Sequence, residues 1–162
     1  MKTLRAVNLL LAALAVLAPM AHLLELPNKL SLDAPLWLAV QQHLYRGWGP
    51  VIGAPTECGA LLTSVLLVLA RRRRPALLRP TAIACVGYAG MLVAFFTLNA
   101  PVNAAVASAT LATLPPDWTR WRAHWEAGHA AAAAFSIVSL LALAWAGNAE
   151  RRQQCAPRAA AT

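Results

Sequence analysis

Residues 118–147 read WTRWRAHWEAGHAAAAAFSIVSLLALAWAG, a polar and aromatic start followed by a long apolar run. The apolar part, 128–146, is close to the ~20 residues that a helix needs to cross the core of a bilayer. Asp117 follows two helix-stopping prolines, 115–116, and can cap a helix that begins at Trp118. The stretch therefore predicts a membrane-spanning helix whose first turns project beyond the membrane.

Three earlier apolar segments have similar lengths and predict three more spans. We place these at about 6–24, 51–70 and 81–98, the last extended to 113. Because 59% of the residues are hydrophobic and only 12% are charged, we expect an all-α integral membrane four-helix bundle. One domain, 1–150, precedes a basic cytoplasmic tail, 151–162. The first segment also has the pattern of a secretory signal, but Pro19 is a poor cleavage context, so we expect a retained span.

The basic residues divide unequally between the two ends of these spans. Ten lie on the side of the termini and of the loop between the second and third spans: Lys2, Arg5, Arg71, Arg72, Arg73, Arg74, Arg79, Arg151, Arg152 and Arg158. Four lie on the opposite side: Lys29, Arg46, Arg120 and Arg122. Since Lys and Arg are enriched in cytoplasmic loops, both termini are predicted to be cytoplasmic, in a bacterial inner membrane. The net charge of +8 then indicates topology and contact with anionic lipids, not a nucleic-acid partner.

The thiols carry no predicted chemistry. Cys58, Cys85 and Cys155 have no CxxC spacing, so we expect no disulfide.

The segment from 25 to 50, between the first two spans, carries its own helical pattern. Asp33 and Pro35 are typical of a helix start. Apolar and aromatic residues then recur at helical spacing: Leu36, Trp37, Val40, Leu44 and Trp48. This pattern predicts an extracytoplasmic interfacial helix or lid. The alternative is that Trp37, Tyr45 and Trp48 form an aromatic belt at the membrane surface.

The ionisable residues of the spans gather at one depth. His22 and Glu25 close the first span, and Glu126 and His129 open the last; each pair is three residues apart and so shares a helical face. At about 1.5 Å per residue, both pairs come out in the outer leaflet or at its surface. Ionisable groups at this depth are costly enough to indicate a functional site, facing the extracytoplasmic side.

Glu57 is predicted to join this layer from the second span. It lies on a stripe of small residues, with Gly53, Ala60 and Ser64, that lets membrane helices approach closely. We therefore expect its carboxylate to point inward, with a protonated structural glutamate as the alternative.

A transition metal accounts economically for this set of side chains. Imidazole and carboxylate ligands suit iron, copper, manganese or zinc, which the sequence does not distinguish. The candidate ligands are His22, Glu25, Glu57, Glu126 and His129. A single metal on His22, His129 and Glu57 is equally compatible, and Glu126 has the alternative of an ion pair with Arg122. A haem with His22 and His129 as axial ligands is a different alternative.

Several motifs resemble a known family. They are HLLELP at 22–27, YRGW at 45–48, NAPVN at 99–103 and WTRWRAHWEAGH at 118–129. With the four-span layout, they resemble the small membrane proteins of unknown function grouped with the anthrone oxygenases, over about 6–146. The resemblance implies oxidation of polycyclic phenolic carbons by molecular oxygen. It implicates these residues: His22, Glu25, Asn99, Asn103, Arg122, Trp125 and His129.

These observations lead to one principal function and two alternatives. The principal hypothesis is a membrane oxidoreductase, a metal-dependent or cofactor-free oxygenase, acting on a small lipophilic or aromatic substrate at the outer leaflet. Glu25, His129 and Arg122 are the predicted catalytic residues. Substrate binding is assigned to six residues: Tyr45, Trp48, Asn99, Asn103, Trp121 and Trp125. The alternatives are a haem or electron-transfer protein and a non-catalytic protein that binds or transports a lipophilic ligand. A homo-oligomer is left open.

Overall fold

The computed structural model of the protein describes the backbone of residues 1–159 and the side chains of residues 1–153. The side chains of Cys155 and Arg158, in the predicted tail, lie outside the described residues. Every regular element of the described chain is a helix, and no strand occurs in it. The predicted all-α class is confirmed.

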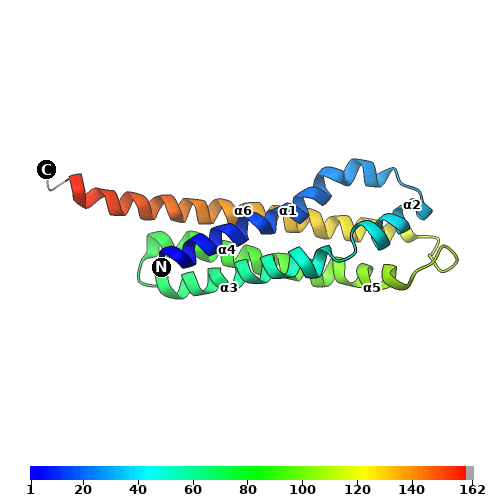
Figure 1. Cartoon of the computed structure of the whole chain (residues 1–162), viewed down its shortest axis with the longest axis horizontal. Helices are drawn as coiled ribbons and strands as arrows, with labels where there is room; N and C mark the ends of the chain where they lie inside the picture. The colour runs from blue at the N-terminus through cyan, green and yellow to red at the C-terminus, as the bar shows by residue number, and fades with distance from the viewer. Residues whose placement is uncertain (160–162) are drawn as a thin grey trace.

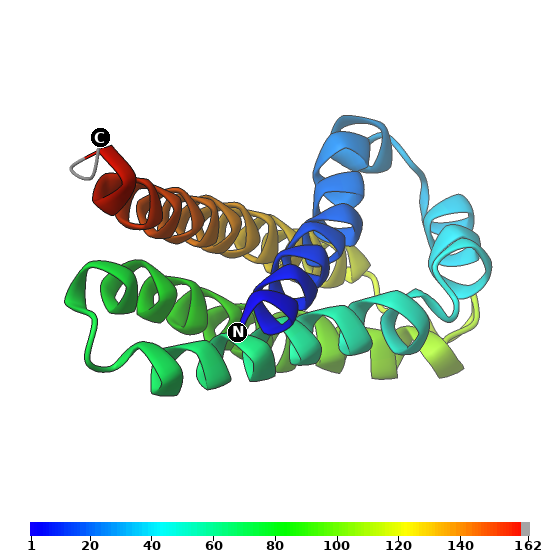
Figure 2. The same cartoon turned by 60° about the vertical axis from the view of Figure 1, so that its left-hand side comes forward.

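Four segments of this described chain are long and apolar enough to cross a membrane, so the protein is an integral membrane helical bundle. They are Lys2–Leu30, Gly49–Arg71, Pro75–Ser108 and Trp118–Gln153. The first turn of α1 (Lys2–Leu30), the last turns of α6 (Trp118–Ala159) and the turn between α3 (Ala54–Arg71) and α4 (Pro75–Ala94) lie at one end of the bundle, here called the terminal end (Figure 1). Figures 1 and 2 both place α2 (Ala34–Ala39) at the opposite end, here called the site end.

The helix boundaries differ from the predicted ones where proline is involved. α1 runs from Lys2 to Leu30 through Pro19 and Pro27, six residues beyond the predicted end of the first span. Membrane helices tolerate internal proline because surrounding groups satisfy the freed carbonyls. The third span begins at Pro75, not at 81, because proline suits the first helical turn. This longer α1 decides the composition of the site.

Near Pro101 a wide helical turn interrupts the third span. A π-helical segment, η3 (Phe95–Asn99), joins α4 to α5 (Ala100–Ser108), with Pro101 in the first turn of α5. Such π-turns commonly interrupt α-helices at functional sites. The third helical segment ends at Ser108, earlier than the predicted 113.

Polar side chains and small residues pack the middle of the bundle. Asn8 is buried and donates to the Ala60 carbonyl at 3.3 Å, Thr63 Oγ1 at 2.8 Å and Ser64 Oγ at 3.0 Å. Interhelical hydrogen bonds and small residues at the interface are what holds membrane helices together. The predicted small-residue stripe of the second span is therefore an interface, and its partner is α1.

The connecting segment folds onto the site end. Asp33 Oδ1 accepts the Leu36 amide at 3.0 Å, which confirms the predicted N-cap of α2. A π-helical turn, η1 (Val40–Leu44), follows, and η2 (Gly49–Gly53) leads into α3. Gly47, with φ of 88°, turns the chain between them.

Trp37 corrects the aromatic-belt alternative for this segment. Its side chain is fully buried, and its ring lies 5.3 Å from that of Trp118, at the start of α6 (Trp118–Ala159). Gln42 also reaches across, donating to the carbonyls of Val106 and Ala109, both at 2.8 Å. Trp37 is thus a core residue of the site end, and the segment covers the ends of α5 and α6.

Candidate functional site

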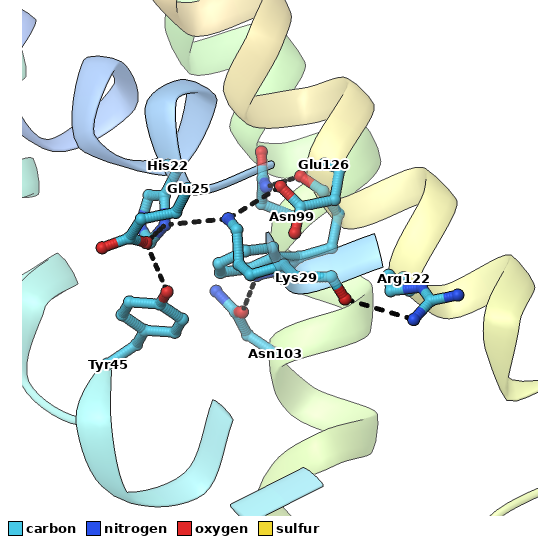
Figure 3. A network of polar contacts seen from close by, with 9 residues as sticks. His22, Glu25, Lys29, Tyr45, Asn99, Asn103, Arg122 and Glu126 are labelled. Atoms are coloured by element: carbon cyan, nitrogen blue, oxygen red, sulfur yellow. Dashed lines mark hydrogen bonds and ion pairs between the residues drawn. The ribbon is translucent and has the colours of Figure 1, made fainter. Parts of the chain in front are cut away.

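A buried ion pair lies at the centre of the polar layer. The Lys29 ammonium is 2.9 Å from Glu126 Oε2, and both side chains are buried, with relative exposures of 4% and 7% (Figure 3). Lys29 Nζ is also 3.4 Å from Nδ1 of His22, on the preceding turns of α1. Because a protonated lysine can only donate, Nδ1 of His22 accepts this hydrogen bond, and Nε2 carries the proton.

Two imidazoles and one indole pack against one another directly beside the ion pair. The ring centroids of His22 and His129 are 4.0 Å apart, and Trp125 lies 4.7 Å from His22 and 4.2 Å from His129. Lys29 Nζ lies 4.8 Å from the centre of the Trp125 ring, a cation–π distance. The structure therefore brings together four of the predicted site residues, His22, Trp125, Glu126 and His129, around a lysine.

The connecting segment closes the site with two aromatic rings. Tyr45 lies 4.6 Å and Trp48 5.7 Å from the His22 ring, between centroids. The Tyr45 hydroxyl donates to Glu25 Oε2 at 2.5 Å. Partial burial raises the pKa of the Tyr45 phenol, and the hydrogen bond and negative charge of Glu25 raise it further. Glu25 itself is half-exposed, 3.8 Å from Nδ1 of His22, so it lies at the rim of the site.

Asn99 and Asn103 hold Trp125 in place, whereas the sequence suggested contact with substrate. Asn99 Nδ2 donates to the Trp125 carbonyl at 2.8 Å, and the Trp125 indole N–H donates to Asn103 Oδ1 at 2.8 Å. Gly128 makes the first contact feasible, because a Cβ at this position would overlap the Asn99 side chain. The NAPVN motif thus orients the indole, which meets both imidazoles in an edge-to-face arrangement.

Arg122 faces away from the ion pair. Its Nη1 donates to the carbonyls of Lys29 at 3.2 Å and Leu32 at 3.0 Å, and its guanidinium lies over the Trp118 ring. It therefore satisfies carbonyls at the end of α1, which a helix leaves without internal partners. The acid that the sequence offered as its partner, Glu126, binds Lys29 in its place. Trp121 packs against the aromatic core of the site end.

Glu57 does not join the cluster. It is half-buried, and it forms no hydrogen bond or ion pair with the side chains that the structure describes. Its Oε1 lies beside Gly53, one turn earlier, where it would be 3.8 Å from a Cβ added to that glycine. The small-residue stripe buries Ala60 and Ser64 against α1, but Glu57 lies at the margin of that stripe.

The arrangement fits an internal ammonium better than a metal ion. Within residues 1–153, no group of three or more His, Cys, Asp or Glu side chains is placed to hold a metal. A metal on Nδ1 of His22 would lie about 2 Å from that nitrogen, in the direction that the Lys29 ammonium occupies at 3.4 Å. Two cations cannot share this acceptor without strong repulsion. Metal binding remains a prediction for elemental analysis.

A haem between the two histidines does not fit this geometry. Axial imidazoles lie on opposite faces of a porphyrin, each with a metal–nitrogen bond of about 2 Å. The centroids of His22 and His129 are only 4.0 Å apart, so the rings contact each other directly.

Comparisons with known proteins add no assignment. No protein-family model, no curated protein and no solved structure matches the chain. The resemblance to the anthrone oxygenase group therefore rests on the motifs alone.

Lys29 is the functional residue that the sequence interpretation missed. From the sequence it is assigned only to the basic residues of the extracytoplasmic side, because the predicted first span ends at about residue 24. Its spacing was informative: His22, Glu25 and Lys29 stand at i, i+3 and i+7, which is one face of a continuous helix.

Proposed function

We propose that the protein is a membrane-embedded oxygenase that needs no cofactor and oxidises a small lipophilic aromatic molecule. The observation that carries the proposal is the buried Lys29–Glu126 pair beside two imidazoles whose ring centroids are 4.0 Å apart. Such a cluster combines a base, a fixed positive charge and an apolar aromatic wall. These are the groups that proton abstraction from a weakly acidic C–H requires.

His129 is the proposed general base. It packs against His22 and Trp125, and within residues 1–153 its nitrogens form no hydrogen bond. His22, in contrast, already accepts from Lys29 through Nδ1, which leaves its Nε2–H as a donor. The two imidazoles therefore have different roles: His129 accepts a proton and His22 donates a hydrogen bond.

Lys29 and Glu126 are proposed to bind the oxygen substituents of the substrate. A lysine ammonium has three N–H donors, and two of them go to His22 and Glu126. The third can stabilise the oxyanion that forms as the proton leaves. Glu126 Oε1 is buried with no hydrogen-bond partner among the described residues, so it can accept from a substrate hydroxyl.

The proposed reaction converts a CH₂ group and O₂ into a carbonyl group and water. His129 takes one proton, and the resulting carbanion, delocalised onto the oxyanion beside Lys29, supplies the electron pair for a new C–O bond. The protonated His129 returns its proton to give a hydroperoxide. Loss of the second C–H proton with cleavage of the O–O bond then yields the carbonyl and water. Every electron that reduces O₂ comes from the substrate, so no further reductant is needed.

The unequal charge of the two ends supports the orientation of this site. The terminal end carries ten of the fourteen Lys and Arg residues, which favours a cytoplasmic location for that end in a bacterial inner membrane. The site end would then face the extracytoplasmic side, where lipophilic molecules in the outer leaflet can reach it.

Oxygen uptake with anthrone as the probe tests the proposal. The purified protein, reconstituted in lipid and treated with a chelator, should consume one O₂ per anthrone oxidised. His129→Gln should lower the rate by about 100-fold or more, the typical contribution of a general base. His124→Gln is the matched control, because His124 is an exposed histidine on the same helix. Equal rates in the two variants would refute the role of His129.

Two other results would replace the proposal. Activity that disappears with the chelator and returns with a stoichiometric metal would favour the metal-dependent oxygenase. Saturable quenching of tryptophan fluorescence by anthrone, without oxygen uptake, would favour a binding or transport protein. The aromatic lining of the site supports this second reading, because Tyr45, Trp48 and Trp125 all contact His22.

A further inference from the structure

The positive charge of the protein is concentrated at the terminal end. Of the six acidic residues, only Glu150 lies there, against ten basic residues; the site end has five acids and four basic residues. The terminal end is thus nine charges positive and the site end one charge negative. The whole net charge of +8 is a property of one end of the bundle.

The single acid of this end is already neutralised. Glu150 Oε2 lies 3.0 Å from Arg5 and 2.8 Å from Arg71, and Arg71 also donates to Thr81 Oγ1 at 2.7 Å. Arg71 is buried, with 3% of its surface exposed. This cluster, here called the Glu150 clasp, connects α1, α3, α4 and α6.

The clasp leaves a group of arginines without an acidic partner. Among the residues whose side chains are described, six exposed arginines at this end form no ion pair: Arg72, Arg73, Arg74, Arg79, Arg151 and Arg152. The Glu150–Arg71 contact also joins two segments far apart in the sequence, the end of α3 and the C-terminal part of α6. We call these six residues the arginine collar.

We propose that the arginine collar is a binding site for the phosphate groups of acidic phospholipids. Arg71 ends one span and Pro75 begins the next, so the collar lies at the height of the lipid headgroups. Guanidinium groups pair with phosphate oxygens through two parallel hydrogen bonds. Bound phosphates would also relieve the repulsion among six like charges that no protein acid balances.

Titration with phosphatidylglycerol tests the site. The full chain in phosphatidylcholine nanodiscs is compared with discs of increasing phosphatidylglycerol content and the same acyl chains. We expect the thermal unfolding temperature to rise to a plateau. Arg72→Gln/Arg73→Gln should shift the half-saturating phosphatidylglycerol fraction upward by about tenfold, given the attraction of each arginine to an anionic surface.

The matched control is Arg46→Gln/Arg120→Gln, which removes two exposed arginines from the site end. This variant should keep the parental half-saturation point. Equal shifts in both variants would indicate a general effect of net charge and would overturn the proposed site, as would an unfolding temperature independent of phosphatidylglycerol. If inorganic phosphate in phosphatidylcholine discs gives the same rise, the site binds free anions and the lipid assignment is wrong.

Discussion

Each end of the bundle pairs a carboxylate with basic side chains, but the surroundings of the two carboxylates differ. At the terminal end, Glu150 binds both Arg5 and Arg71, and the second nitrogen of Arg71 bonds Thr81. At the site end, Glu126 binds Lys29 through one oxygen, and its other oxygen has no partner among the described residues.

This difference distinguishes a structural cluster from a site that can bind a ligand. A polar network whose groups are all paired rigidifies a fold, whereas an unpaired buried acceptor costs free energy until something bonds it. The Glu150 clasp connects helices from all four spans, and among the described side chains it leaves no buried polar atom without a partner. The Lys29–Glu126 pair joins only α1 to α6, but it keeps a donor and an acceptor beside two imidazoles.

The largest effect on stability is expected at Lys29. Lys29→Met should leave the Glu126 carboxylate buried and unpaired, at a cost of about 3 to 5 kcal/mol in unfolding free energy. Lys29→Met/Glu126→Leu should recover most of that loss, because a well-packed apolar pair replaces an ion pair. Unfolding in mixed micelles measures both variants. If Lys29→Met alone is as stable as the parent, water reaches the Lys29–Glu126 pair and the pair is not buried as the structure indicates.

Removal of Arg71 from the clasp should have a smaller effect. Arg71→Met loses the bonds to Glu150 and Thr81, but Arg5 still pairs with Glu150, so no charge is left alone. We expect a loss of about 1.5 to 3 kcal/mol, the range for hydrogen bonds to charged groups. A loss larger than that of Lys29→Met in the same assay would reverse the proposed contrast between the two ends.

Gly128 tests how closely Asn99 approaches α6. Gly128→Ala should cost about 1 to 3 kcal/mol, because its Cβ would overlap the Asn99 side chain. Gly147→Ala, on the same helix, is the matched control: no heavy atom lies within 4 Å of a Cβ there. Because alanine has a higher helix propensity than glycine, the Gly147→Ala variant should be as stable as the parent or more stable. Similar losses in the two variants would mean that the Asn99 contact is loose.

Tyr45 provides a test in the pH dependence of stability. The raised pKa of the folded phenol means that stability is fully present below the ordinary value of about 10 and is lost as pH rises beyond it. Tyr45→Phe should lower stability by about 0.5 to 1 kcal/mol at neutral pH. The variant should also lose less stability than the parent as pH rises above about 10. Unfolding temperature measured as a function of pH tests both expectations. If the unfolding temperature of the variant falls at high pH as much as that of the parent, groups other than Tyr45 cause the loss of stability.

The smallest effect is expected at Glu57, which neither cluster includes. Glu57→Gln should change unfolding free energy by less than about 0.5 kcal/mol and leave oxygen uptake unchanged. A tenfold loss of turnover would return Glu57 to the site and would favour the metal-dependent reading of the sequence.

Much of the site could be predicted from local spacing. The two pairs three residues apart, His22 with Glu25 and Glu126 with His129, follow from the helical period, and three of these four meet around Lys29. The helix period could not identify the partner of Glu126, because Arg122 on the same helix was as good a candidate as a residue on another helix. The packing of α1 against α6 makes Lys29 the partner of Glu126.

Glu57 shows the opposite failure. Its small-residue stripe correctly predicts a helix interface at Ala60 and Ser64, yet Glu57 lies at the margin of that interface. The four residues of the stripe lie within about 60° of one another around the helix, and packing against α1 decides which of them are covered. Asn8 was overlooked for the related reason that a lone asparagine carries no periodic signal before its partners on α3 are known.

The amino-acid sequence by itself determined the class of this protein, the number of its spans and the layer in which its ionisable residues gather. These properties depend on hydrophobic length, helical period and charge distribution, which are local or summed along the chain. Only the tertiary structure decided that α1 continues through Pro27, that Lys29 lies between His22 and Glu126, and that Arg71 is buried in a clasp. Those outcomes depend on which helices touch, because a buried charge takes the partner that packing brings within reach.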